Sequence, residues 1–222
     1  MLAGLRDWSM PAVVAAAVIA VAAAFFFSRD RGPAPKLPPE EGSRAEATRF
    51  MSELMSGKVP VGGSFTLSDQ HGNKRSLADF RGKIVLLYFG YTFCPDVCPT
   101  DMLAMAQLID SLGAAGSQLQ PVFVTLDPQR DTREMLGRYA ASFHPRFVAL
   151  SGTDDEIRTV ASAYKIFFEK VQPPGSKVYL IDHMAFIFLL NREGKYIGSF
   201  PPGTAAVRMA EVVREHLLPG IP

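Results

Sequence analysis

The chain has 222 residues, 48% of them apolar, and its 23 Lys and Arg nearly balance 22 Asp and Glu, for a formal net charge of +1. This length and apolar content suffice for one core domain with an appendage, and they exclude a wholly disordered chain. The near-neutral charge and the lack of Lys or Arg runs argue against nucleic acid as a partner.

The first predicted element is a membrane anchor at residues 10–27, preceded by a short segment at residues 1–9. All residues from 10 to 27 are apolar, and a helix of this length spans about 27 Å, close to the hydrocarbon core of a bilayer. A cleaved signal peptide is the alternative, because Ala20-Val21-Ala22 resembles a small-residue cleavage site. The apolar run continues past that site through Phe27, which favours an uncleaved anchor.

Residues 28–57 are predicted to form a tether. The segment is rich in Pro, Gly and charge, as in semi-extended linkers that hold a domain off a membrane. Within it, residues 45–55 predict a short helix with Met51 and Met55 on one face. Two thioethers at this spacing suggest a copper site, but such pairs are more often part of an apolar face, which is the interpretation we adopt.

Residues 58–222 predict one α/β domain. Residues 63–77 read as two short strands joined by a turn at His71-Gly72-Asn73. The apolar run Lys83 to Gly90 predicts a strand buried on both faces. A helix ending near Gly113 follows, and residues 120–127 predict a second central strand.

The rest of the domain continues the alternation of helices and strands. Segments resembling capping boxes predict two more helices, and turn residues predict two strand pairs before a closing helix. The alternation implies a partly parallel sheet covered on both faces, with sites at the carboxyl ends of its strands. The predicted positions are helix starts at 131–134 and 153–156, a hairpin at 165–182 turning at 173–175, strands within 185–200, and a helix at 204–217.

Both cysteines of the chain, Cys94 and Cys98, directly follow the first buried strand in "YTFCPDVCPT". We interpret Pro99 as the first helical residue and Cys98 as the N-cap, where the helix dipole favours a thiolate. A structural disulfide is the alternative, but a loop this short gains little stability from one. The position therefore indicates a redox couple or a soft-metal site.

The spacing of the cysteines narrows the choice. Three residues separate them, whereas thioredoxin-like redox motifs have two. Peroxiredoxin-type sites require Thr three residues before the reactive Cys, and Tyr91 occupies that position. A peroxidase or a general thioredoxin is therefore disfavoured. A gap of three can place both sulfurs on one side, where they share an ion that requires a third ligand.

One of the four histidines is a candidate for that ligand. His71 lies in a polar turn, His144 precedes a proline and His216 lies on the closing helix, so each is interpreted as a surface or capping residue. His183 immediately precedes the apolar strand at 185–190, although a strand-end His is often only hydrogen-bonded. If His183 meets the cysteines, two thiolates and an imidazole suit copper, and zinc less securely because one position stays open.

Three segments of the chain resemble the signatures of the Sco/SenC family: "FGYTFCPDVCPTDM", "VTLDPQRDT" and "YLIDHMAFIFLLNREGKYIGSF". Members of this family are membrane-anchored copper-binding proteins that take part in cytochrome c oxidase assembly. The resemblance runs from about Pro60 to Leu218. It implies an α/β, thioredoxin-like fold with an inserted hairpin, preceded by a single N-terminal transmembrane helix.

The resemblance also implies the site residues. It makes Cys94 and Cys98 the thiol ligands of copper, His183 the third ligand, and Asp127 an acidic residue near the site. The alternative for Asp127 is a turn-forming role before Pro128. The family varies at the position of Phe93, where His is common, which casts no doubt on the ligands.

Two functions follow from the resemblance. The first is a copper chaperone that helps assemble the CuA centre of cytochrome c oxidase; the second is a thiol–disulfide oxidoreductase that reduces the oxidase's copper-site cysteines. Only the first requires His183. Expected partners are the copper-bearing oxidase subunit, a thiol reductant and another copper carrier. The resemblance places the domain in the periplasm or the mitochondrial intermembrane space, whereas the flanking Lys and Arg weakly favour the opposite orientation.

Overall fold

A computed structural model describes Ser52 and residues 60–217 of the chain. The predicted anchor at 10–27, the tether at 28–57 apart from Ser52, and the methionine pair lie outside the described residues. Within the described part, no helix has the length and apolar character needed to cross a membrane.

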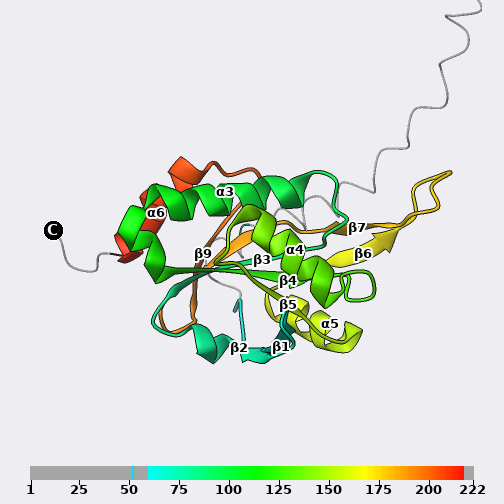
Figure 1. Cartoon of the computed structure of the whole chain (residues 1–222), viewed down its shortest axis with the longest axis horizontal. Helices are drawn as coiled ribbons and strands as arrows, with labels where there is room; N and C mark the ends of the chain where they lie inside the picture. The colour runs from blue at the N-terminus through cyan, green and yellow to red at the C-terminus, as the bar shows by residue number, and fades with distance from the viewer. Residues whose placement is uncertain (1–51, 53–59, 218–222) are drawn as a thin grey trace, which may run out of the picture. The chain divides into compact units, whose positions relative to one another are not determined.

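The domain is built on a seven-stranded sheet with the strand order β2-β1-β5-β4-β3-β8-β9 (Figure 1). The three central strands β3, β4 and β5 are parallel, and the remaining pairs are antiparallel. The partly parallel sheet predicted from the sequence is therefore confirmed. The bounds are β1 Thr66–Asp69, β2 Lys74–Ser76, β3 Ile84–Gly90, β4 Leu119–Thr125, β5 Val148–Ser151, β8 Ile187–Leu190 and β9 Tyr196–Phe200.

Helices cover both faces of this sheet. Three of them, α3, α4 and α6, lie on one side and α5 lies on the other (Figure 1). The capping box predicted at Thr153 starts α5, whereas α4 is capped by Thr132, whose hydroxyl accepts from the Met135 N–H. The bounds are α3 Val97–Ser111, α4 Arg133–Phe143, α5 Asp154–Ala163 and α6 Ala206–Leu217, with 3₁₀ turns η1 Leu77–Phe80 and η2 Gly113–Gln118.

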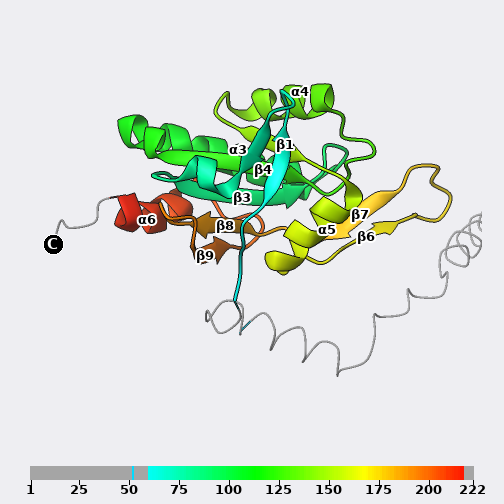
Figure 2. The same ribbon diagram turned by 90° about the horizontal axis from the view of Figure 1, so that it is seen from below.

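The inserted hairpin predicted from the sequence is present. Strands β6 (Phe168–Val171) and β7 (Leu180–His183) form a separate two-stranded antiparallel sheet that extends from one end of the domain (Figures 1 and 2). Phe168 pairs with His183, and the Met184 N–H donates to the Phe167 carbonyl at 3.1 Å. The hairpin thus delivers His183 at the end of its second strand.

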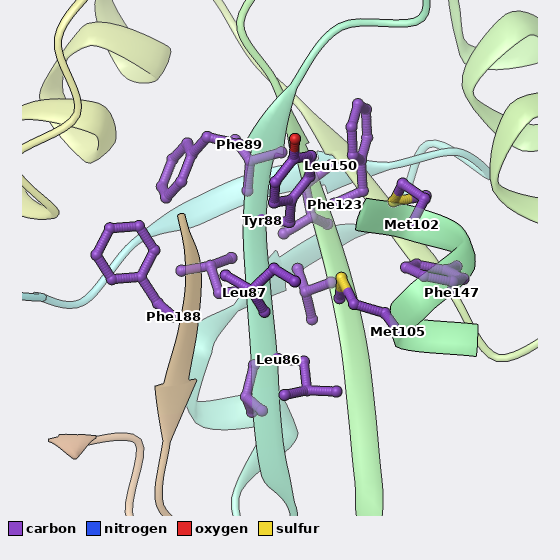
Figure 3. Packing of buried hydrophobic residues seen from close by; sticks show 14 of the residues in the cluster. Leu86, Leu87, Tyr88, Phe89, Met102, Met105, Phe123, Phe147, Leu150 and Phe188 are labelled. Atoms are coloured by element: carbon purple, nitrogen blue, oxygen red, sulfur yellow. The ribbon is translucent and has the colours of Figure 1, made fainter. Parts of the chain in front are cut away.

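The cysteine loop begins at the end of β3, an inner strand of the sheet that the core holds in place. Every residue of β3 and β4 is buried, and alternation along β3 sends Tyr88 toward Met102 and Met105 of α3 and Phe89 to the opposite face (Figure 3). The Phe89 and Phe188 rings pack edge to face, with centroids 6.1 Å apart. The loop that carries the cysteines therefore starts from a rigidly packed strand.

Candidate metal centre

The three predicted ligands converge at one end of the sheet. The ligand atoms of Cys94, Cys98 and His183 all lie within 4.8 Å of one another, and no other such group of three occurs among the described residues. The Cys98 Sγ and His183 Nε2 atoms are 3.5 Å apart, and both thiols are free. The loop after β3, the first turn of α3 and the end of β7 each supply one member.

The start of α3 differs from the sequence prediction. The helix begins at Val97 with Asp96 as N-cap, so Cys98 is the second helical residue instead of the cap. Pro99 is the third helical residue, and proline is tolerated there because the N–H groups of the first turn have no intrahelical partner. The Cys98 backbone N–H donates to the Cys94 sulfur at 3.5 Å. Cys94 is therefore the thiol that lies in front of the helix N-terminus.

The two thiols have opposite acid–base character. A hydrogen bond from the Cys98 thiol, aided by His183 and by backbone N–H groups and opposed by burial, lowers the pKa of Cys94 to about 4. The same hydrogen bond, together with burial, raises the pKa of Cys98 well above its usual range. In the metal-free protein at neutral pH, Cys94 is the thiolate and Cys98 is its hydrogen-bond donor.

The imidazole of His183 is oriented for ligation. Its Nδ1 lies 3.3 Å from the Met184 carbonyl oxygen, and its Nε2 lies 3.5 Å from the Cys98 sulfur. When the ring proton is on Nδ1 and donates to this carbonyl oxygen, Nε2 carries the lone pair that can bind a metal. The Tyr91 ring packs edge to face with the imidazole at a centroid distance of 6.0 Å. Hydrogen bonding and packing together direct Nε2 toward the sulfurs.

Asp127 has a different environment from the three ligands. Its side chain is fully buried and is not part of the ligand group. One carboxylate oxygen accepts from the Arg130 Nε–H, and the other accepts from the Tyr179 hydroxyl at 2.9 Å. Its backbone carbonyl accepts from the N–H groups of Arg130 and Asp131, so it also forms the turn after β4. Its carboxylate is directed toward Arg130 and Tyr179.

The remaining histidines lie apart from this group. His71 and His216 are exposed. His144 accepts a backbone hydrogen bond from Arg146 at 3.2 Å and lies 3.5 Å from the Asp110 carboxylate. Their interpretation as surface or capping residues agrees with these positions.

Sequence reasoning missed polar residues beneath and beside the cysteines. Asp101, one turn after Cys98, is fully buried; its carboxylate accepts from the Gly203 N–H at 2.8 Å, and burial raises its pKa. An acidic residue among the apolar positions of this helix was the available signal. Arg130, whose guanidinium carbon lies 3.6 Å from the Tyr179 ring centroid, had no signal beyond its place in "VTLDPQRDT".

The centre is open on one side. Cys94 and His183 are partly exposed, whereas Cys98 is completely buried. A pocket of about 350 Å³ next to His183 is lined by Phe167, Phe168, Glu169, Asp182, His183 and Met184. An incoming ligand would therefore reach the centre from the side of Cys94 and His183.

The donor set fits copper. Thiolate and imidazole ligands together suit copper and zinc, and a three-ligand set leaves a zinc site incomplete. Sulfur and nitrogen ligands lie about 2.0 to 2.3 Å from such metals, so atoms within 4.8 Å of one another need only small movements to share one ion.

Known proteins with similar sequences and folds include copper-bound ones. The bovine (Bos taurus) protein SCO2 homolog, mitochondrial, is 34% identical over 180 residues, which cover 80% of this chain and 66% of that protein. The copper-bound structure of Bradyrhizobium japonicum ScoI is 33% identical, covers 70% of this chain and 99% of that chain, and has a TM-score of 0.65. The structure of copper-bound yeast Sco1 is 32% identical, covers 74% of this chain and 92% of that chain, and has a TM-score of 0.66.

These likenesses confirm the mixed α/β fold, and the structure of this chain itself shows the inserted hairpin as β6 and β7. The sequence model of the family described as SCO1/SenC matches residues 54–218, which is most of the chain. The chain belongs to the SCO1/SenC family.

Proposed function

We propose that this chain binds copper through Cys94, Cys98 and His183. The observation that carries the proposal is the convergence of the three ligand atoms within 4.8 Å, with His183 supplied from a hairpin 85 positions after Cys98. The proposal is further supported by copper in two solved structures of similar proteins.

The copper is cargo to be transferred, and the client is the CuA centre of cytochrome c oxidase. Partial exposure of Cys94 and His183 supports transfer, because the ligands of an acceptor can enter from their side while buried Cys98 still holds the ion. The Sco/SenC signatures of the sequence support the oxidase as the client. The partners are the copper-bearing oxidase subunit and another copper carrier that loads this chain.

A second candidate function is reduction of the oxidase's copper-site cysteines. It is favoured by the two free, adjacent thiols and by the lowered pKa of partly exposed Cys94. In this reaction the client disulfide becomes two thiols, while Cys94 and Cys98 become a disulfide that a separate thiol reductant must reopen.

The membrane arrangement is part of the proposal. Residues 10–27 anchor the chain, residues 28–57 form the tether, and residues 58–222 form the copper-binding domain in the periplasm or intermembrane space. The apolar run of the sequence supports the anchor, and the mitochondrial name of the bovine relative supports such a compartment.

Cells that depend on this chain for oxidase assembly separate the two functions. The variant His183→Ala removes the nitrogen ligand and leaves both thiols in place. If the chain delivers copper, cells with His183→Ala should lose CuA assembly. Cells with the matched control His144→Ala should keep it. If His183→Ala cells assemble the oxidase normally and Cys94→Ser cells do not, the reductase function replaces the chaperone function.

A further inference from the structure

The loop between β4 and α4, residues 126–132, contacts both segments that supply the candidate ligands. These are the cysteine loop and the β6–β7 hairpin, which ends at His183. We propose that Arg130 in this loop is a positioning residue that holds the β6–β7 hairpin, and with it His183, beside the cysteines. The inference rests on the proposed copper function, because it assigns a role toward the third ligand of that site.

The loop is fixed first to the cysteine loop. The buried carboxylate of Asp131 accepts from the backbone N–H of Thr92 at 3.0 Å and from the Thr92 hydroxyl at 2.6 Å. It also accepts from the Thr125 hydroxyl at the end of β4. Thr92 lies two residues before Cys94, so the β4–α4 loop and the cysteine loop form one hydrogen-bonded unit.

Arg130 connects this unit to the hairpin. Its Nη1 donates to the carbonyl oxygen of Tyr179 at 2.9 Å, and its guanidinium carbon lies 3.6 Å from the centroid of the Tyr179 ring. Tyr179 immediately precedes β7, whose last residue is His183. A hydrogen bond and a cation–π contact therefore act on the strand that carries the ligand.

Arg130 is itself held in one orientation. Its Nε–H donates to Asp127, which is fully buried, while the Arg130 side chain is 19% exposed. The guanidinium carbon also lies 4.8 Å from the centroid of the Phe93 ring, next to Cys94. The Tyr179 hydroxyl donates to the same Asp127 carboxylate at 2.9 Å. The ion pair, the stacking and the shared acceptor fix the guanidinium between the cysteine loop and the hairpin.

The hairpin depends on contacts with the rest of the domain. Its two strands form their own sheet, separate from the seven-stranded sheet, and an isolated two-stranded hairpin is at best marginally stable in water. Ile181 of β7 is buried in the core and Phe168 of β6 packs against it, while Arg130 adds the hydrogen bond and the cation–π contact at the start of β7. The cysteines, in contrast, follow a strand buried in the core. Loss of the Arg130 contacts should therefore displace His183 while both thiols stay in place.

The test measures copper binding by the reduced full-length chain in detergent. We expect Arg130→Gln to weaken Cu(I) binding, measured by competition with a chromogenic chelator, by about 10- to 100-fold, as is typical when a residue that orients a ligand is lost. X-ray absorption should show that the nitrogen ligand is lost, as in His183→Ala. Arg138→Gln, at an exposed arginine of α4, is the matched control and should bind like the wild type.

A double-mutant cycle shows whether Arg130 acts through His183. In the His183→Ala background, Arg130→Gln should change the affinity by less than about twofold, because the ligand that it positions is already gone. A full additive loss in that background would overturn the proposal, as would an Arg130→Gln protein that keeps wild-type affinity and its nitrogen ligand.

Two measures keep the test decisive. Arg130→Gln leaves Asp127 as an unpaired buried charge, so Asp127→Asn combined with Arg130→Gln is the second variant and should show the same loss of the nitrogen ligand. Hydrogen exchange of residues 180–183 is also compared in the metal-free protein. If the wild type binds no copper, the proposed function fails; faster exchange in the variants then still supports positioning by Arg130, and unchanged exchange overturns it.

Discussion

The Nε2 atom of His183 lies 3.5 Å from the sulfur of Cys98, although 85 positions separate the two residues in the sequence. The contact joins the first turn of α3 to the end of β7. The centre therefore forms only when the inserted hairpin folds against the cysteine loop. Copper bound to all three side chains would in turn stabilise this arrangement, because a ligand stabilises the state that binds it.

The domain at residues 58–222 should be soluble, folded and monomeric on its own. The long apolar run of the sequence ends at Phe27, and the core of the described domain is formed from its own strands and helices. Size-exclusion chromatography with light scattering in detergent-free buffer measures the outcome. Aggregation under these conditions would show that the domain boundary is wrong.

Oxidation should switch copper binding off. A disulfide between Cys94 and Cys98 consumes both sulfur ligands and leaves only the imidazole, so the oxidised protein should retain no copper after desalting. An oxidising compartment then makes a dedicated reductant necessary. Stoichiometric copper in a protein with no titratable thiols would contradict this prediction.

Alkylation of Cys94 in the reduced, metal-free protein should depend little on pH. The pKa of Cys94 is lowered to about 4, so its thiolate persists from pH 9 down to pH 6, whereas a thiol with a pKa of about 8.5 loses roughly 200-fold of its thiolate over that range. We expect the iodoacetamide rate at Cys94, followed by mass spectrometry, to change less than about threefold. A decline parallel to that of free cysteine would show that the pKa of Cys94 is not lowered.

Gly90→Ala should disturb the packing around Cys98. A Cβ at Gly90 would lie 2.9 Å from the Cys98 sulfur and 3.0 Å from the Phe123 ring, so the substitution should cost about 1 to 3 kcal/mol in the free energy of unfolding and weaken copper binding. Gly198→Ala, in β9, is the control, because its Cβ would meet no atom within 4 Å. Equal stability of the two variants in urea would argue against this packing.

Much of the fold could be predicted because its signals are local. The buried runs of β3 and β4, the capping box of α5 and the turn residues of the hairpin each act within a few positions of the chain. The start of α3 was predicted two residues too late, because Pro99 fits several positions of a first turn and the sequence does not distinguish among them.

Less of the candidate site than of the fold could be predicted from the sequence. Position alone made His183 the one candidate among the four histidines, but it could not show that His183 meets the cysteines, because the distance between them depends on how the hairpin packs. The direction of the Asp127 carboxylate depends on Arg130 and on Tyr179, 52 positions away. Asp101 was missed because a carboxylate on a helix is usually exposed, and only tertiary packing buries this one.

Copper content and coordination of the reduced chain test the central claim most directly. Wild-type protein loaded with Cu(I) and desalted should hold one copper per chain, with two sulfur ligands and one nitrogen ligand by X-ray absorption. His183→Ala should lose the nitrogen ligand and most of its affinity, while its thiol–disulfide exchange rate should change by less than about tenfold, because exchange depends on thiolate character and access. Wild-type protein without copper, or His183→Ala with unchanged affinity and coordination, would contradict the account.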